Sequence, residues 1–235
     1  MSRVAIVAAL EREVRPLVKG WHVSEKEHEG RRFRFFEKDD VVVLCGGIGS
    51  QAARRAAEAV ISLFHPQIIY SVGFAGGLDA ALKVGDIVRP SRIVNASDGS
   101  SITLSGGQGV LISFAAVTGL EQKLKLRESY GAHAVDMEAA AVASAAEAHG
   151  IQLAAIKVIS DRADFELPPM DRFVSPDGSF AEARFALFAA LRPWIWLQVA
   201  RLAGDTRRAA RALCNDLAKI ADAHADLQNR GPVKL

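Results

Sequence analysis

The feature that most constrains the fold is an alternation of short apolar runs with alanine-rich segments. Most of the apolar runs are uninterrupted and rich in β-branched residues, as in strands that are buried on both faces. The alanine-rich segments between them carry apolar residues at helical spacing. We therefore expect an α/β fold in which helices cover both faces of a sheet. The expected strands are Val4–Ala9, Val41–Cys45, Gln67–Val72, Asp86–Val94, Gly109–Ala116 and Leu153–Ile159, and the clearest helices are Gln51–Phe64 and Met137–His149.

The chain length favours one domain. Its 235 residues, 50% of them hydrophobic, are enough to bury one large core, and the sequence contains no repeat and no linker. We expect a single domain over residues 1–235, with a helical C-terminal extension from about residue 179. The stretch from Asn95 to Gln108 is rich in turn residues, which predicts a loop that is able to lie over a substrate.

Composition excludes several classes of function. The 29 Lys and Arg nearly balance the 27 Asp and Glu, so nucleic acid is not the expected partner. Cys45 and Cys214 match no zinc or redox spacing, and we interpret both as buried thiols in a reducing compartment. The histidines have no ligand spacing, and no metal is expected. The N-terminal apolar run stops at Glu11, and no run of about 18 apolar residues occurs, which predicts a cytoplasmic protein.

Two glycine-rich turns follow apolar strands, at Gly46–Gly49 and Gly73–Gly77. Glycine lets a backbone turn sharply and approach a ligand closely, although tight turns without a ligand explain the pattern equally well. Neither turn has the Gly-x-Gly-x-x-Gly spacing of a dinucleotide site, and no Walker lysine follows. A Gly-x-Ser-x-Gly elbow is also absent from the sequence, which argues against a Ser-His-Asp hydrolase.

Three acidic residues stand at the positions where α/β sheets bind ligands. Asp161 follows a buried strand directly, at the carboxyl edge of the expected sheet. Glu13 follows the first strand, and Glu138 opens an alanine-rich helix, where a capping role is the alternative. We expect the three acids to converge on one edge, whereas Glu11 and Arg12 are expected to be solvated.

With these acids in place, the sequence resembles the purine and uridine phosphorylase superfamily, most closely its methylthioadenosine/S-adenosylhomocysteine nucleosidase branch. The order and spacing of six short motifs over about the first 165 residues carry the resemblance. It implies a three-layer αβα sandwich with a central mixed sheet. The motifs are Val4–Val7 with Glu13-Val14, Gly47–Gly49, Ala75–Leu78, Leu82–Val88, Asp136–Ala139 and Ile159–Asp161.

The resemblance also implies a role for each acid. Asp161 would be the general acid that protonates or hydrogen-bonds the purine N7, so that the base leaves neutral. Glu138 would grip the ribose hydroxyls while Met137 packs on the sugar, and Glu13 would position or deprotonate an attacking water. The other expected substrate contacts are Phe74, Gly76, Val117, Thr118 and Ser160.

Departures from the family pattern leave the nucleophile open between water and phosphate. Phe74 stands where hydrolases and many phosphorylases carry Ser or Thr, and the arginine of phosphorylases is missing before this turn. Arg15, Arg89 or Arg92 is a substitute for that arginine if phosphate is a co-substrate. No other cofactor is expected. The segment from residue 91 to residue 110 is shorter than in the usual nucleosidases, which is expected to remodel the 5′ side of the pocket.

The C-terminal third combines an aromatic segment, Leu191–Leu197, with an arginine-rich helix. Core packing beside a solvated basic face is the first interpretation, and an apolar groove or membrane-surface patch is the second. This tail is similar to that of hopanoid-associated nucleoside phosphorylases, which implies a lipid-linked substrate. The helix carries Arg201, Arg207, Arg208 and Arg211, with a stripe of Leu213, Leu217 and Ile220.

Together these patterns predict an enzyme that releases adenine from a 5′-substituted adenosine, with adenosylhopane of hopanoid biosynthesis as the implied substrate. The alternatives are a methylthioadenosine/S-adenosylhomocysteine nucleosidase and a non-catalytic nucleoside- or lipid-binding protein on the same fold. The expected partners are a small purine nucleoside, an anionic membrane surface at the C-terminal helices, and a second copy of the chain in a homodimer.

Overall fold

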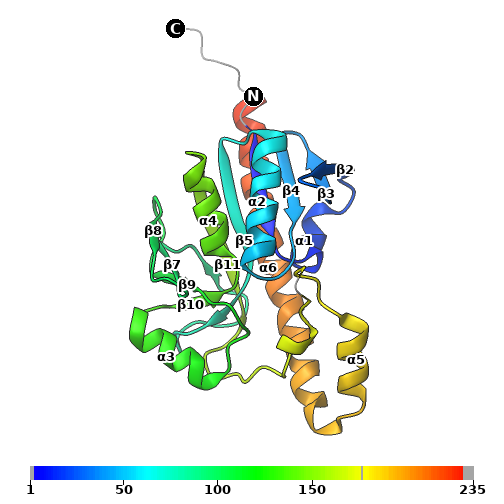
Figure 1. The fold of residues 1–235 in the computed structure, drawn as a ribbon, viewed down its shortest axis with the longest axis vertical. Coiled ribbons are helices and arrows are strands. Elements are labelled where there is room, and N and C mark those ends of the chain that lie inside the picture. The colour runs from blue at the N-terminus through cyan, green and yellow to red at the C-terminus, as the bar shows by residue number, and fades with distance from the viewer. Residues whose placement is uncertain (1–2, 176, 230–235) are drawn as a thin grey trace.

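One mixed sheet organises the chain in the computed structural model, which describes residues 3–175 and 177–229 (Figure 1). Within the described residues the sheet has eleven strands in the order β2-β3-β4-β1-β5-β10-β9-β7-β8, and β11 pairs with β5 and β6. The strands are β1 Val4–Ala8, β2 His22–His28, β3 Arg31–Lys38, β4 Val41–Cys45, β5 Ile68–Gly77, β6 Ile87–Val88, β7 Arg92–Asn95, β8 Ser101–Thr103, β9 Val110–Ser113, β10 Ala134–Asp136 and β11 Gln152–Asp161.

The central strands are parallel and buried on both faces, as their uninterrupted apolar sequences predict. β1 pairs in parallel with β4 and β5, and β5 pairs in parallel with β11. Successive side chains of a strand point to opposite faces. Ala5 and Val7 therefore pack in one core cluster, whereas Val4, Ile6 and Ala8 pack in another on the opposite face.

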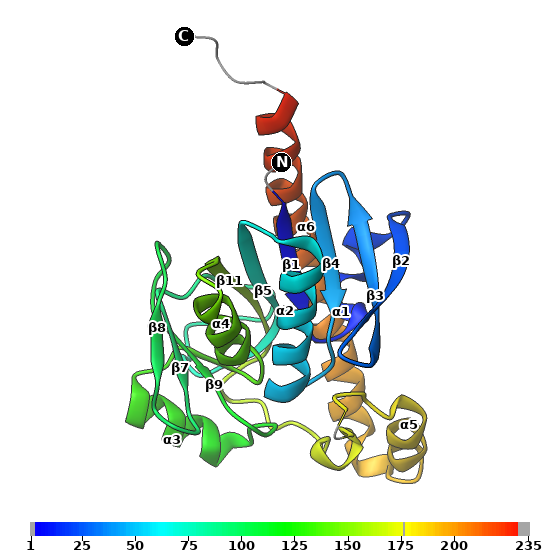
Figure 2. The same cartoon turned by 45° about the horizontal axis from the view of Figure 1, so that its top comes forward.

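Helices cover both faces of the sheet, which gives three layers (Figure 2). The helices are α1 Glu11–Val18, α2 Ser50–Phe64, α3 Leu120–Tyr130, α4 Ala139–Ala148, α5 Glu182–Ala190 and α6 Trp196–Asn229, with single 3₁₀ turns at Asp171–Phe173 and Pro193–Ile195. α2 and α4 pack on one face through alanine-rich surfaces, and α1 and α6 pack on the other. The predicted αβα sandwich with a central mixed sheet is confirmed.

The sequence interpretation was wrong at several boundaries. The antiparallel hairpin β2–β3 was not predicted, although Phe33 and Phe35 alternate with charged residues, as in a half-exposed strand. Pro90 follows the two-residue strand β6, so the expected strand Asp86–Val94 is two strands, β6 and β7. The expected loop Asn95–Gln108 contains β8, whose Ser-Ile-Thr sequence pairs antiparallel with β7.

The C-terminal residues have two environments along α6. Leu213 and Leu217 are fully buried against the sheet, and Cys214 between them is buried as well. Of the two cysteines expected to be buried, Cys45 of β4 is only half-buried. The first turns of α6 and the whole of α5 instead form a hairpin that extends beyond the sheet, at the lower right of Figure 1. Among the described residues, no helix has the length and apolar character needed to cross a membrane.

Candidate active site

A cavity of about 420 Å³ opens at the carboxyl ends of β1, β5 and β11, beside β10. This is the edge where open α/β sheets bind their ligands. The structure places every predicted site residue in its wall: Glu13, Phe74, Gly76, Val117, Thr118, Met137, Glu138, Ser160 and Asp161.

Glu13 enters the cavity from the first turn of α1 and is 4% exposed. Its Oε2 accepts hydrogen bonds from the backbone N–H groups of Ala9 at 3.2 Å and Leu10 at 3.3 Å, which lie at the start of that helix. Burial raises the pKa of Glu13, although the nearby Lys157 ammonium opposes the shift. A buried carboxylate with a raised pKa is suited to accept a proton from water near neutral pH.

Gly73 makes the position of Glu13 possible. A Cβ at Gly73 would lie 2.8 Å from Glu13 Oε2, and Gly73 has a φ of +135°, which side chains rarely adopt. The following residue, Phe74, also lines the cavity, at the position where the family pattern has a hydroxyl residue. The glycine of this turn therefore leaves room for the carboxylate.

Glu138 is the N-cap residue of α4, but its side chain makes no capping hydrogen bond and is held by two other backbone N–H groups. Its Oε1 accepts from Gly49 N at 2.8 Å, and its Oε2 accepts from Met137 N at 3.2 Å. The N-cap hydrogen bond to Ala139 N comes from Asp136 instead, at 2.9 Å. Burial, and then the neighbouring Asp136 carboxylate, raise the pKa of Glu138 to about 7.

Asp136 and Lys157 form a buried ion pair beside Glu138, with their charged atoms 2.9 Å apart and the side chains 0% and 1% exposed. Asp136 also accepts a 2.6 Å hydrogen bond from Ser113 Oγ, and Lys157 donates to Val72 O at 3.3 Å. Burial by itself would lower the pKa of Lys157, but the surrounding carboxylates raise it above its usual range. The ammonium is therefore charged and faces three acids of the cavity wall.

A break in the strand pairing brings Ser160 and Asp161 into the same cavity. The register between β11 and β5 shifts between Ile159 and Asp161. Without this β-bulge, the neighbouring side chains of Ser160 and Asp161 would point to opposite faces. Ser160 Oγ lies 2.7 Å from Asp161 Oδ1, and Lys123 Nζ lies 2.6 Å from Asp161 Oδ2.

The segment expected to contact the base, Val117-Thr118, is held by a residue that is distant in the sequence. Val117 N donates to Asp171 Oδ1 at 2.9 Å, and Thr118 is buried in the cavity wall. Gly76 lines the same cavity, and a Cβ at Gly76 would lie 3.2 Å from Asp161 Oδ2. The absence of a side chain at Gly76 thus lets the Asp161 carboxyl group pack closely against β5.

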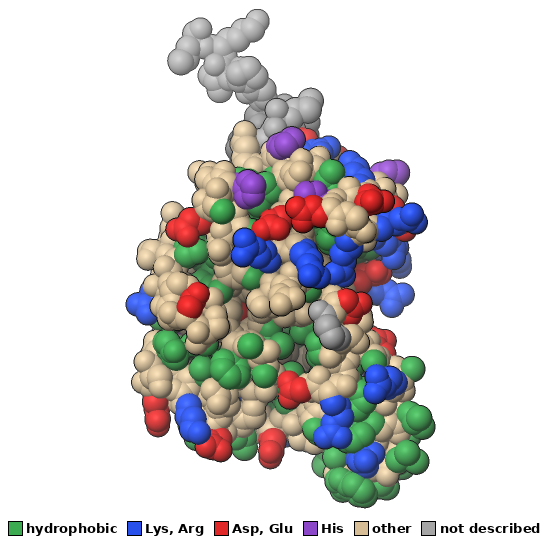
Figure 3. Space-filling view, viewed as in Figure 1, with side chains coloured by type: hydrophobic (Ala, Val, Ile, Leu, Met, Phe, Trp, Pro, Cys, Tyr) green, Lys and Arg blue, Asp and Glu red, His purple; other side chains and the backbone are tan. Residues whose placement is uncertain are grey.

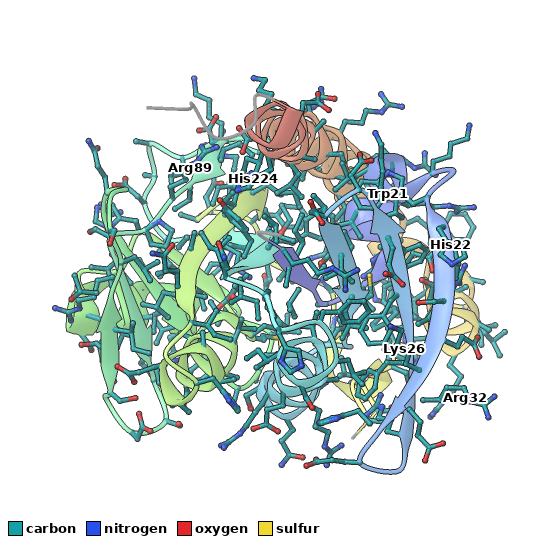
Figure 4. The ribbon with its side chains drawn as sticks, turned by 90° about the horizontal axis from the view of Figure 1, so that it is seen from above. Trp21, His22, Lys26, Arg32, Arg89 and His224 are labelled. Carbon is teal, nitrogen blue, oxygen red and sulfur yellow. The ribbon has the colours of Figure 1, made fainter. Side chains whose placement is uncertain are left out.

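Among the described residues Arg12 is the one arginine in the cavity wall, and it was expected to be merely solvated. It lies 3.6 Å from Glu182 of α5, with its guanidinium over the Phe180 ring. The three arginines considered as phosphate ligands are elsewhere: Arg15 and Arg92 are exposed outside the cavity, and Arg89 forms an ion pair with Asp216 on α6 (Figure 4). None of the three is placed to hold phosphate in this cavity.

The opposite end of the cavity is apolar and comes from the C-terminal third. The loop after β11, α5 and the start of α6 supply this wall, and no residue of the segment 95–108 contributes to it. The expectation that this segment lies over a substrate is therefore wrong. The apolar wall consists of Leu167, Met170, Val174, Phe180, Phe185, Val199, Leu202 and Ala203.

Close backbone contacts hold this wall against the glycine turn. Ile48 N donates to Gly178 O at 2.7 Å, and a Cβ at Gly47 would lie 3.1 Å from the backbone of Gly178. Both glycines have positive φ angles. Two segments that are distant in the sequence thereby close one side of the cavity.

Two lysines of the site were missed from the sequence. Lys157 interrupts an apolar strand, and a lysine in a buried strand is itself a signal of a charge partner. Lys123 lies in a mostly polar helix and gave no such signal. The described residues contain no group of three or more His, Cys, Asp or Glu side chains arranged to hold a metal ion.

Comparison with known proteins gives a family and a fold. The model of the phosphorylase superfamily matches residues 3–118 and 109–189. The 5′-methylthioadenosine/S-adenosylhomocysteine nucleosidase of Actinobacillus succinogenes is 28% identical over 204 residues, which cover 70% of this chain and 87% of that protein. Its counterpart in Marinomonas sp. is 33% identical over 99 residues, which cover 40% of this chain and only 42% of that relative.

The solved structures agree on the fold. The Neisseria meningitidis 5′-methylthioadenosine/S-adenosylhomocysteine nucleosidase, in complex with methylthio-immucillin-A, superimposes with a TM-score of 0.71. The match covers 95% of this chain and 100% of that chain at 21% identity. The resemblance seen in the sequence motifs is thus confirmed at the level of family and architecture.

Proposed function

The chain belongs to the phosphorylase superfamily, and from this premise we propose that it cleaves the N-glycosidic bond of a 5′-substituted adenosine and releases adenine. The observation that carries the proposal is the convergence of Glu13, Glu138 and Asp161 in the wall of one cavity. The nucleosidases among its relatives act, by their names, on 5′-substituted adenosines.

The geometry supports a separate role for each acid. Glu138, held by two backbone N–H groups, is positioned to accept hydrogen bonds from the ribose hydroxyls while Met137 packs on the sugar. Asp161 lines the cavity beside Gly76, where the base would bind. As the bond to the base breaks, the ribose gains positive charge, which the carboxylates of the wall stabilise.

We propose water rather than phosphate as the nucleophile. Glu13 has a raised pKa and is free of a direct ion pair in the described structure, which suits a general base. The one arginine found in the described cavity wall is paired with Glu182, and the wall carries five acidic residues, which disfavour a phosphate anion. Phosphorolysis, a glycosyl transfer to phosphate, is the alternative outcome of the assay below.

The apolar wall supports a large hydrophobic 5′ substituent. The end of the cavity with the candidate catalytic residues is acidic. The rest is lined by aliphatic and aromatic side chains, among them Phe185 of α5 and Leu202 of α6. A lipid-linked adenosine such as adenosylhopane, as in hopanoid biosynthesis, has a polar nucleoside for the acidic end and an apolar arm for the apolar wall. It therefore fits the cavity better than an adenosine with only a methylthio group. The apolar arm would lie along the C-terminal helices.

The same helices support contact with an anionic membrane surface. Trp194 is 77% and Leu197 is 83% exposed at the tip of the hairpin. Exposed arginines such as Arg184 and Arg201 lie on the two helices beside them, so that a face of mixed apolar and basic side chains results (Figure 3). Exposed tryptophan with flanking arginine is the pattern of interfacial binding. The expectation of core packing for this segment is wrong, because in the segment 191–197 only Ile195 is buried.

Vesicle binding tests the membrane contact. The protein is incubated with neutral vesicles and with vesicles that contain anionic phospholipid, and the bound fraction is measured by flotation. We expect binding to anionic vesicles, loss of that binding in the Trp194→Glu/Leu197→Glu variant, and no loss in Leu124→Glu, whose exposed leucine lies on α3. Equal binding by both variants would contradict the proposal.

The catalytic proposal is tested by adenine release from methylthioadenosine, adenosine and adenosylhopane, each with and without phosphate. We expect release without phosphate, a free ribose product by mass, and the highest kcat/KM with the apolar 5′ arm. A ribose 1-phosphate product would identify a phosphorylase. Retained nucleoside binding with no release from any substrate would identify a binding protein. The homodimer and the cytoplasmic location remain predictions, which size-exclusion chromatography and cell fractionation address.

A further inference from the structure

Lys123 is a buried cation that contacts the candidate acid of the site. It is 2% exposed, and its Nζ lies 2.6 Å from Asp161 Oδ2, 2.7 Å from Arg162 O and 3.3 Å from Phe165 O. Three acceptors match the three protons of an ammonium, so the geometry is that of charged lysine. Lys123 does not line the cavity and therefore acts from behind Asp161.

The position of Lys123 on α3 is unusual for this helix. α3 is largely exposed, and only Lys123 and Leu126 of its residues are buried. A buried charge costs several kcal/mol unless it is paired and hydrogen-bonded. The two carbonyl contacts anchor the loop after β11, but the third contact is made to Asp161 itself.

This pair changes the chemistry available at Asp161. Asp161 Oδ2 accepts a hydrogen bond from Lys123 Nζ at 2.6 Å, and Asp161 Oδ1 accepts one from Ser160 Oγ at 2.7 Å. A carboxyl group whose two oxygens both accept hydrogen bonds directs no proton of its own at N7 of a leaving base. Asp161 alone is therefore not a complete general acid.

We propose that Lys123 is a positioning residue that supplies the proton for leaving-group departure through Asp161, an inference that rests on the proposed function. As the N-glycosidic bond breaks, its electron pair moves to the base. A proton passes from Lys123 Nζ to Asp161 Oδ2 and from there to N7, so the Nζ–H bond breaks and the N7–H bond forms. The base leaves neutral, Asp161 returns to a carboxylate, and the neutral amine of Lys123 regains a proton from water before the next turnover.

The packing around Gly76 holds this pair together. A Cβ at Gly76 would lie 3.2 Å from Asp161 Oδ2 and 3.6 Å from Lys123 Cε, so a side chain there would crowd both groups. Asp161 lines the cavity, whereas Lys123 does not. A base in the cavity would therefore meet the carboxyl group, with Lys123 behind it.

The experiment compares two leaving groups in Lys123→Met, Lys123→Arg and the wild type. Methylthioadenosine has a leaving group that needs a proton, whereas p-nitrophenyl 5-methylthioriboside releases nitrophenolate, which needs none. Because general acid catalysis contributes about 10²–10⁴-fold, we expect Lys123→Met to lower kcat for methylthioadenosine by about 100-fold or more. For the nitrophenyl substrate, the same variant should change kcat less than about fivefold. Lys123→Arg retains the charge, but a guanidinium does not give up a proton, so this variant should leave most of the loss with methylthioadenosine in place.

Lys125→Met is the matched control, because Lys125 lies on the same helix with its side chain 62% exposed. It should leave both activities unchanged. Equal losses with both substrates would show that Lys123 only maintains the structure, and unchanged activity in Lys123→Met would also overturn the inference. If the wild type cleaves methylthioadenosine and Lys123→Met gives one of these two results, only the proton route is refuted and the proposed function stands. A wild type that releases no adenine contradicts the proposed function, and the inference with it.

Discussion

Lys157 of β11 lies 2.9 Å from Asp136 of β10, and both side chains are buried. The pair connects two strands that do not pair with each other, since β5 lies beside both. Burial raises the pKa values of Glu13 and Glu138, and the same ammonium opposes this rise in both. One cation therefore stabilises three carboxyl groups of the acidic wall, those of Glu13, Asp136 and Glu138.

Replacing Lys157 with Met should destabilise the protein strongly. Removal of one partner of a buried ion pair leaves an unpaired charge, which typically costs about 3–5 kcal/mol. Urea unfolding of Lys157→Met, followed by circular dichroism, measures the loss in free energy of unfolding. The exposed Lys125 provides a control, and Lys125→Met should change stability by less than about 0.5 kcal/mol. A loss below about 1 kcal/mol in Lys157→Met would contradict a stabilising role of this ion pair.

Glu138 should make stability depend on pH between about 4.5 and 7. Its pKa in the folded protein is about 7, above the ordinary value of 4.5, so the folded state holds this proton more tightly than the unfolded state does. The resulting stabilisation is fully present below the ordinary value and is lost as pH rises through about 7. Gln cannot ionise, so Glu138→Gln should gain Tm relative to the wild type between pH 4.5 and pH 8.

Thermal unfolding at several pH values in this range measures the difference. The control is Glu128→Gln, because Glu128 is exposed on α3. Its Tm difference from the wild type should not vary with pH. A constant difference between Glu138→Gln and the wild type would mean that Glu138 ionises in the folded protein as it does in the unfolded chain.

Glu13→Gln should lower kcat while leaving KM within about threefold. Gln keeps an oxygen that accepts from Ala9 N and Leu10 N but is unable to take a proton from water. Loss of a general base typically lowers the rate by about 10²–10⁴-fold. Steady-state adenine release from methylthioadenosine measures the effect. Glu11→Gln, on the exposed side of the same helix turn, should retain activity, and a Glu13→Gln variant as active as the wild type would remove Glu13 from the mechanism.

The sequence predicted the acids of the site better than their partners. Asp161, Glu13 and Glu138 follow or flank recognisable strands and helices, and the carboxyl ends of parallel strands meet at one edge. Lys157 was detectable as a lysine inside an apolar strand. Lys123 was not, because in a polar helix a buried lysine looks like an exposed one until the tertiary packing is known.

The C-terminal third shows a second limit of prediction. Periodicity correctly indicates that Leu213 and Leu217 face the sheet. It cannot distinguish a buried aromatic segment from an exposed one, and Trp194 and Leu197 are exposed because the hairpin extends beyond the sheet. The contribution of this hairpin to the cavity depends on the long-range contact between Gly47 and Gly178, for which the local sequence carries no signal.

The length of the 5′ substituent should determine substrate preference. Burial of one CH₂ group contributes about 0.8 kcal/mol, or roughly fourfold in kcat/KM, as long as the apolar wall has room for the added group. We expect kcat/KM to rise along a series of methylthio-, butylthio- and octylthioadenosine. Leu202→Ser should flatten this rise, because Leu202 lines the cavity. Leu187→Ser should preserve it, because Leu187 lies outside the cavity wall and is 64% exposed. A wild-type series that is flat or falls with chain length would mean that the apolar wall does not bind the 5′ arm, and would favour a small 5′ group such as methylthio as the natural substituent.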